Sequence, residues 1–231
     1  MKILVCMHIE NEGPGTLGDY LLAENVPLRL CRLYDAELLP EDPLEFDAIV
    51  SMGGPMNVYE EDKYPFLKEE TLFLRRAIAS GVPILGICLG AQMIAKACGS
   101  AVTKAPVSEL GWAWIQLTTA ARTDPLFEGV SETLPVFQWH EDTFEIPAGG
   151  QRLATSQACR NQAFRYRNAC GLQFHLEVTQ EMLKEWFRDP DRQRPMVDSY
   201  EEHKAELSTN AKTLYANLLT QMRTRKAVRG S

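Results

Sequence analysis

The segment at residues 82–90 constrains the fold of this chain more than any other. It begins with the apolar run Val-Pro-Ile-Leu-Gly-Ile, which is typical of a buried strand. A helical pattern follows over residues 89–98 and stops at Gly99. Between them lies Gly-Ile-Cys-Leu-Gly at 86–90, so the strand reaches the helix through a cysteine with a glycine on each side. This arrangement predicts a nucleophile elbow with Cys88 at its tip.

The two glycines have a physical role in such a turn. Side chains at positions 86 and 90 would collide with neighbouring backbone, and glycine avoids the collision. The N-terminus of the following helix favours a thiolate at Cys88, and the N–H of Leu89 can receive a developing oxyanion. The alternative is a buried core cysteine, but core packing does not require glycine on both sides of it.

The first hundred residues alternate between apolar runs and helical patterns. Runs at 2–7, 28–33 and 47–52 predict further buried strands, and residues 65–80 predict a helix with acidic residues early and basic residues late. Strands that alternate with helices in this way indicate an α/β fold, with a mostly parallel central sheet flanked by helices.

The rest of the chain has a different hydrophobic pattern. Short strand-like runs predict antiparallel additions to the sheet or a small second sheet, at 112–118, 134–139, 162–167 and 169–175. A helical stripe follows, formed by Leu207, Ala211, Leu214, Leu218 and Met222. We expect the stripe to pack onto the domain, with a dimer or partner surface as the alternative. The length fits a single domain over 1–231 with a helical C-terminal extension at about 178–224.

Composition excludes several classes of function. The net charge of −7 opposes binding to phosphate backbones, so we expect no nucleic acid partner. No apolar run reaches the length of a membrane span, and the apolar start is too short for a signal peptide. The six cysteines are irregularly spaced and the four histidines lie far apart, so we expect neither a disulfide framework nor a metal site. These features predict a reduced, cytoplasmic protein without a cofactor.

Two further segments carry chemistry. In Gly-Leu-Gln-Phe-His-Leu-Glu at 171–177, His175 and Glu177 are two residues apart and face the same side of an extended chain. The carboxylate can therefore hold the imidazole in one tautomer while the imidazole faces a thiol. The second segment is Ser-Met-Gly-Gly-Pro at 51–55, where a Gly-Gly turn can offer another backbone N–H.

Together these motifs resemble the class I glutamine amidotransferase family. The resemblance covers most of residues 1–178 and is closest to stand-alone members related to the glutaminase domain of GMP synthetase. It rests on GGP at 53–55, G-x-C-x-G-x-Q at 86–92 and Q-F-H-x-E at 173–177. ELGW at 109–112 and WHED at 139–142 are also placed as in the family. The resemblance implies a flavodoxin-like α/β fold and hydrolysis of the glutamine side-chain amide.

The resemblance also implies roles for individual residues. Cys88 matches the nucleophile, His175 the residue that protonates departing ammonia, and Glu177 the residue that orients this histidine. The oxyanion-hole donors match Gly53 and Leu89, and the substrate-binding residues match Gly54 and Gln92. His140 matches a family histidine outside the triad and receives no catalytic role. Leu176 stands where the family has proline, and we expect little effect on the chemistry because leucine can also be extended.

The sequence leaves several functions open. Residues 178–231 are too short for an ATP-using synthetase, so an amidotransferase component would need a synthetase partner or another ammonia acceptor. A γ-glutamyl peptidase could use the same triad on γ-glutamyl peptides or glutathione conjugates. A non-catalytic binding protein would not require an intact triad, and a redox-sensing thiol would not require His175 and Glu177. An oligomer is compatible with all of these.

Overall fold

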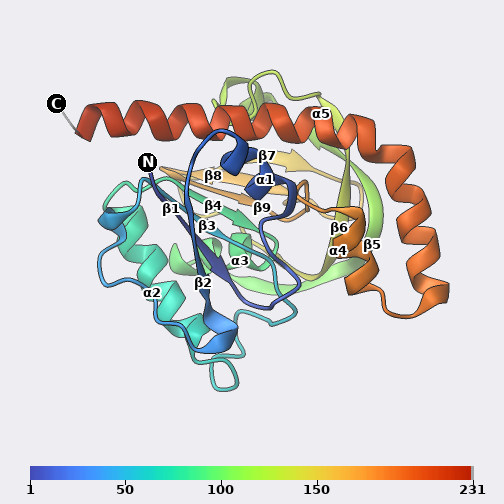
Figure 1. Cartoon of the computed structure of the whole chain (residues 1–231), viewed down its shortest axis with the longest axis horizontal. Helices are drawn as coiled ribbons and strands as arrows, with labels where there is room; N and C mark the ends of the chain where they lie inside the picture. The colour runs from blue at the N-terminus through green and yellow to red at the C-terminus, as the bar shows by residue number, and fades with distance from the viewer. Residues whose placement is uncertain (230–231) are drawn as a thin grey trace.

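A single sheet organises the protein. The computed structural model describes the backbone of residues 1–229 and the side chains of residues 1–225. Within residues 1–229, nine strands form one sheet in the order β2-β1-β3-β4-β9-β8-β7-β5-β6 (Figure 1). The parallel strands are β1 (Ile3–Met7), β2 (Leu28–Arg32), β3 (Ala48–Ser51), β4 (Ile84–Ile87) and β9 (Ala169–Leu172).

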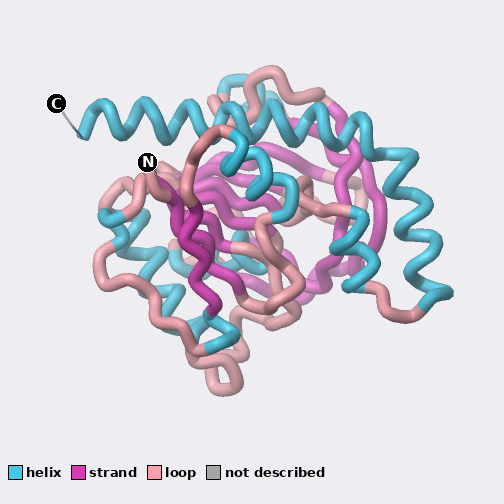
Figure 2. Tube along the Cα trace, viewed as in Figure 1, coloured by secondary structure: helices cyan, strands magenta, loops and turns pink. Residues whose placement is uncertain are grey.

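The remaining strands extend the same sheet with antiparallel pairs. They are β5 (Val102–Leu117), β6 (Thr133–Phe144), β7 (Gln151–Thr155) and β8 (Ala163–Tyr166). The prediction of a mostly parallel sheet with antiparallel additions is therefore confirmed, and the alternative of a second sheet is wrong. Long strands β5 and β6 form a broad hairpin at one edge, which the tube in Figure 2 shows as a pair of curved ribbons.

Helices cover both faces of the sheet. Apolar residues of α1 (Gly15–Ala23), α4 (Gln180–Trp186) and α5 (Pro190–Arg229) pack in one core cluster. Those of α2 (Phe66–Ala79) and α3 (Leu89–Ala97) pack in the other. Strand β1 alternates between the two, because Ile3 and Val5 face the first cluster while Leu4 faces the second. Short 3₁₀ turns occupy Leu33–Asp35, Pro43–Glu45 and Thr119–Thr123.

The C-terminal helix packs along the sheet through the predicted stripe. In Figure 1, α5 crosses the top of the molecule and turns downward near the strands β5 and β6. The stripe residues are buried: Leu207, Ala211, Leu214, Leu218 and Met222. The expectation that they pack onto the domain is therefore confirmed. None of the helices within residues 1–229 combines the length and apolar character that a membrane span needs.

The sheet brings the chemical motifs to one edge. The carboxyl ends of β1, β3, β4 and β9 are neighbours in the sheet order. The motifs at 51–55, 86–90 and 173–177 follow or end three of these strands, and residues 8–12 follow β1. In open parallel sheets this edge is the usual place for a ligand. The observed strands differ from the sequence prediction in several ways: β5 begins earlier, at Val102, β6 runs on to Phe144, and β9 ends earlier, at Leu172. Strand β7 was not predicted.

Candidate active site

Cys88 lies in a strained turn between β4 and α3. Its backbone has φ 51° and ψ −106°, a conformation that residues with a side chain rarely adopt. The N–H of Cys88 donates to the carbonyl of Leu172 at 2.7 Å, so the turn is fixed against the end of β9. Strain of this kind persists only where surrounding structure imposes it, and it is common at functional sites.

The glycines beside Cys88 allow three backbone segments to meet. A Cβ at Gly86 would lie 2.5 Å from the carbonyl carbon of Gly90. A Cβ at Gly90 would lie 2.0 Å from the backbone oxygen of Ser51, at the end of β3. Both glycines are therefore required by close approach, as the sequence predicted. For Gly90, however, the obstacle is the neighbouring strand rather than the cysteine itself.

His175 and Glu177 form a buried pair just beyond β9. Nδ1 of His175 lies 2.7 Å from Oε1 of Glu177, and both side chains are almost fully buried. The segment is held on two sides. His175 exchanges backbone hydrogen bonds with Phe137 of β6, and the carbonyl of Glu177 accepts from the N–H of Thr16 at the start of α1. Leu176, in place of the family proline, is itself buried.

The surroundings of His175 favour its charged form. Burial lowers the pKa of His175, but the Glu177 carboxylate and a hydrogen bond with Cys88 outweigh it, so the pKa stands well above its ordinary value. The structure thus brings Cys88, His175 and Glu177 together in the order that a thiol, base and orienting carboxylate need.

Backbone N–H groups near Cys88 lack partners. Within residues 1–229, no acceptor is hydrogen-bonded to the N–H of Gly53 or Leu89. The next N–H groups of α3 are occupied, since Gly90 donates to Met52 and Gln92 to Cys88. Unpaired N–H groups beside a nucleophile are suited to an oxyanion.

A buried polar network supports the loop that carries Gly53. Nδ1 of His8 lies 3.0 Å from the carbonyl oxygen of Gly53, and Nε2 lies 2.6 Å from Glu70. The other oxygen of Glu70 accepts from the Ser51 hydroxyl at 2.8 Å. Burial lowers the pKa of His8, yet Glu70 and the Gly53 carbonyl raise it above its ordinary value. His8 can therefore donate from both ring nitrogens and fix the loop.

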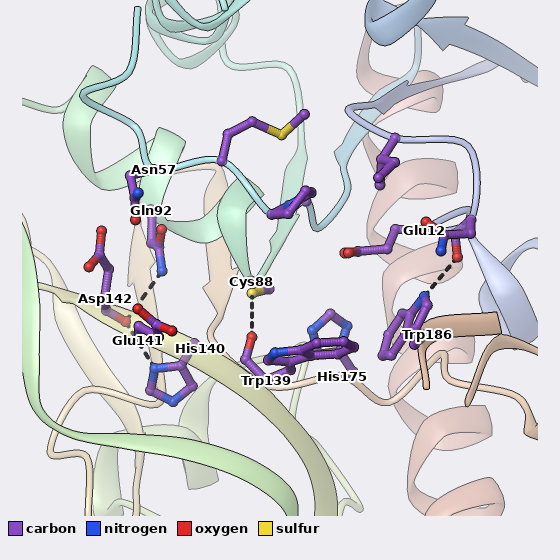
Figure 3. A pocket seen from close by; sticks show the side chains of 15 residues that line it. Glu12, Asn57, Cys88, Gln92, Trp139, His140, Glu141, Asp142, His175 and Trp186 are labelled. Atoms are coloured by element: carbon purple, nitrogen blue, oxygen red, sulfur yellow. Dashed lines mark hydrogen bonds between the residues drawn. The ribbon is translucent and has the colours of Figure 1, made fainter. Parts of the chain in front are cut away.

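A pocket with a volume of about 370 Å³ opens above Cys88. Figure 3 shows Asn57, Gln92 and Asp142 on one side of Cys88, with Glu12 and Trp186 on the other. Gln92 is buried and donates to the carbonyl of Asp142 and to Gln173, both at 3.3 Å. Gly54, the other predicted substrate-binding residue, also lines the pocket.

Two pocket residues received no role from the sequence. Asp142 is buried and its carboxylate has no hydrogen-bond partner among the described side chains, although Lys104 Nζ lies 3.4 Å from Oδ1. Glu12 belongs to the loop after β1, far from the motifs in sequence. The WHED segment could have indicated Asp142, but no local pattern indicated Glu12.

A second buried cluster supports the strand that carries Asp142. Glu109, His140 and Cys159 bring potential metal ligands within 4.8 Å of one another. The Glu109 carboxylate is already engaged, with His140 at 3.0 Å, Gln162 at 2.7 Å and Ser156 at 3.2 Å. His140 also lies 2.9 Å from the carbonyl of Asp142. This hydrogen-bond network satisfies its members and fixes the backbone at Asp142.

Comparison with known proteins identifies the family. The family model described as "Glutamine amidotransferase class-I" matches residues 17–189. The chain belongs to the class I glutamine amidotransferase family. A glutamine amidotransferase-like protein of Salmonella typhimurium, YfeJ, is 31% identical over 188 residues, which cover 80% of this chain and 79% of that protein.

The chain is also similar to part of a longer protein and to proteins of about its own length. A glutamine-hydrolysing GMP synthase of Thermosipho melanesiensis is 38% identical over 63% of this chain, but the match spans only 28% of that synthase. A glutamine amidotransferase from Thermotoga maritima is similar in structure, with a TM-score of 0.81 and 33% identity over 96% of this chain and 97% of that one. One from Methylobacillus flagellatus has a TM-score of 0.84 and 29% identity over 95% and 94%.

The close contact at Gly90 generates the first prediction. Gly90→Ala should lower the free energy of unfolding by about 3 kcal/mol or more, because the new methyl group meets the rigid backbone of Ser51. Urea denaturation measures the change. Gly13→Ala is the matched control, since the nearest atom would lie at an ordinary 3.5 Å, and it should stay within about 0.5 kcal/mol of wild type. Equal stability of the two variants would contradict the close approach.

The network around His8 generates a prediction about pH. Because the pKa of His8 is raised on folding, its contribution to stability is fully present below the unfolded pKa of about 6.5 and is lost as pH rises through the folded value. Glu70→Gln removes the main cause of this increase. Urea unfolding from about pH 5.5 to about pH 9 should therefore show a stability difference that is largest at low pH. A difference that grows with pH would contradict the assignment.

Proposed function

We propose that the protein hydrolyses the side-chain amide of glutamine through a γ-glutamyl thioester on Cys88. The observation that carries the proposal is the position of His175, which is paired with Glu177 at 2.7 Å and lines the same pocket as Cys88, close enough for the two to interact. A buried core cysteine would need neither this pair nor a strained turn.

The first half of the reaction forms the thioester. The Cys88 thiolate attacks the amide carbon, and the negative charge that develops on the oxygen is received by the N–H groups of Gly53 and Leu89. The C–N bond then breaks as His175 gives its proton to the leaving nitrogen, and ammonia departs. Glu177 keeps the imidazole oriented and stabilises its charged form.

The second half releases glutamate. His175, now neutral, takes a proton from a water molecule, and the hydroxide attacks the thioester carbon. The tetrahedral intermediate collapses with the Cys88 thiolate as leaving group, and the proton on His175 restores the ion pair. The same N–H groups serve both intermediates, so the site does not need to rearrange between the two steps.

Asp142 explains how the amino acid is held. Its carboxylate is buried and lines the pocket, with Lys104 Nζ 3.4 Å from Oδ1. An ammonium group in the pocket would bring a second positive charge to this carboxylate and offset part of the cost of burying it. We assign it to the α-ammonium group of the substrate. Asn57 and Gln92 lie on the same side of Cys88 as Asp142 (Figure 3), and Gly54 also lines the pocket. We assign Asn57 and the backbone of Gly54 to the α-carboxylate.

Related GMP synthases are much longer than this chain, so delivery of ammonia to an acceptor would need a further domain or a synthetase partner. This partner, the cytoplasmic location and the single-domain organisation over 1–231 remain predictions. A γ-glutamyl peptidase is the second candidate. It is favoured by the continuation of the pocket past Cys88 to Ile9, Asn11 and Trp186, which leaves room for a substituent on the leaving nitrogen.

The decisive experiment compares glutamate release by the wild type and by Cys88→Ala. Glutamine, glutathione and simple γ-glutamyl dipeptides are the substrates. The variant should be inactive on all of them and should unfold at the same urea concentration as wild type, because it removes only one sulfur at the edge of a pocket. Undiminished release by Cys88→Ala would overturn the proposal. Release from glutamine favours the glutaminase, and release from the dipeptides favours the peptidase.

The division of roles within the triad gives another prediction. His175→Ala removes the proton donor and acceptor, whereas Glu177→Gln leaves an imidazole that is less well oriented. We expect Glu177→Gln to retain about a hundredfold more activity than His175→Ala, as for the orienting carboxylate in serine triads. Values of kcat for glutamate release test this. Equal losses would show that Glu177 does more than orient His175.

A further inference from the structure

The pocket has a second side that the hydrolysis of glutamine does not use. Relative to Cys88, it lies opposite Asn57, Gln92 and Asp142, and Figure 3 shows Glu12 and Trp186 there. If the glutamyl part of the substrate binds on the side of Asp142, a group attached to the leaving nitrogen must bind on the side of Glu12 and Trp186. The character of this side therefore determines which substituted amides the site accepts.

Glu12 lies beside the residue that handles the leaving group. A Cβ placed on Gly53 would be 2.3 Å from Oε2 of Glu12 and 3.1 Å from Cε1 of His175, so the carboxylate and the imidazole flank the same point. In Figure 3 the side chain of Glu12 extends toward Cys88. Within residues 1–225, no side chain or backbone group is hydrogen-bonded to this carboxylate.

Glu12 is half-buried and forms no ion pair with the described side chains. Burial and the nearby Glu177 raise the pKa of Glu12, whereas the imidazoles of His175 and His8 lower it. His8 is itself paired with Glu70, at 2.6 Å. His175 is already paired with Glu177, at 2.7 Å, so it does not neutralise Glu12 as well. A carboxylate in this situation gains free energy when a ligand brings a positive charge to it.

The residue next to Glu12 in the chain also has an unsatisfied acceptor. Oδ1 of Asn11 is buried without a hydrogen-bond donor in the described part of the chain. The backbone oxygen of Asn11 accepts from Nε1 of Trp186 at 2.8 Å, and the indole lines the pocket. An aromatic face and unsatisfied oxygens form a favourable environment for an ammonium group. None of the described residues that line the pocket is lysine or arginine.

We propose that Glu12, Asn11 and Trp186 form a leaving-group subsite for a cationic substituent. The substrate class is then γ-glutamyl amines whose nitrogen substituent ends in an ammonium group. This inference rests on the proposed thioester chemistry. Cys88 forms the thioester, the C–N bond breaks, His175 protonates the leaving nitrogen, and water then releases glutamate. The products are glutamate and a free diamine.

The same subsite disfavours γ-glutamyl amino acids. Their leaving group carries a carboxylate, which would face Glu12 in a poorly solvated site and be repelled. Discrimination would thus come from an unfavourable contact with the wrong substrate as well as a favourable contact with the right one. Glutamine itself leaves only ammonia, so its hydrolysis should depend little on Glu12.

Matched substrates test the charge preference directly. The γ-glutamyl derivatives of putrescine, pentylamine and γ-aminobutyrate have leaving groups of similar length that are cationic, neutral and anionic. For wild type, kcat/KM for glutamate release should favour the putrescine derivative over the pentylamine derivative by about tenfold, with the γ-aminobutyrate derivative lowest. Equal values, or a preference for the neutral or anionic compound, would overturn the subsite.

Removing one negative charge at position 12 or at position 10 distinguishes a specific effect of Glu12 from a general effect of charge on this loop. Glu12→Gln should bring the putrescine and pentylamine values close together and raise that of the γ-aminobutyrate derivative. Glu10→Gln is the control, because Glu10 lies in the same loop, is exposed and does not line the pocket, and it should keep the wild-type order. An unchanged order in Glu12→Gln would contradict the assignment of Glu12.

A binding measurement distinguishes failure of the subsite from failure of the proposed chemistry. Calorimetry with Cys88→Ala and the same compounds needs no turnover, and the dissociation constants should follow the same order. If wild type hydrolyses glutamine but kcat/KM and the dissociation constants show no preference among the three compounds, the subsite is overturned and the proposed function stands. If the dissociation constants follow the expected order but wild type hydrolyses none of the compounds, the subsite stands and the proposed function is overturned. Neither binding nor hydrolysis would overturn both.

Discussion

The approach of Gly90 to the backbone of Ser51 is the contact on which the site depends. It leaves room for main chain only, since a Cβ at Gly90 would lie 2.0 Å from the Ser51 oxygen. The N–H of Gly90 donates to the carbonyl of Met52 at 3.0 Å, so the nucleophile turn and the loop after β3 form one unit. The N–H groups of Gly53 and Leu89 belong to these two segments, and their relative position is therefore set by backbone packing rather than by side chains.

The network of His8, Glu70 and Ser51 extends this constraint into the core. A buried ion pair contributes little net stability, because desolvation of both charges offsets much of their attraction. Its value here is geometric: one carboxylate holds the Ser51 hydroxyl, and the imidazole reaches the carbonyl of Gly53. This contact fixes the plane of the Gly53–Gly54 peptide directly. It also limits movement of the preceding Met52–Gly53 peptide, whose N–H we assign to the oxyanion.

Local chemistry made part of the site predictable. The elbow at 86–90 and the spacing of His175 and Glu177 are properties of short segments, and the parallel sheet followed from alternating patterns. Strand β7 and the first half of β5 were not predicted from the sequence. Their residues are largely exposed or half-buried, so their hydrophobic pattern is weak. Glu12 and the pairing of His8 with Glu70 join positions far apart in the chain, and a single sequence has no signal for such contacts.

The charge distribution of the pocket also bears on product release. Acidic groups line both sides, with Asp142 on one and Glu12 on the other. Lys104 is paired with Asp142, but no lysine or arginine is among the described residues that line the pocket. The substrate amide is neutral, but hydrolysis converts it into a carboxylate that faces Glu12 and the regenerated thiolate of Cys88. Like charges in a poorly solvated site repel. The proposed reaction would therefore weaken the binding of its own product, and release of glutamate would be favoured without any movement of the protein.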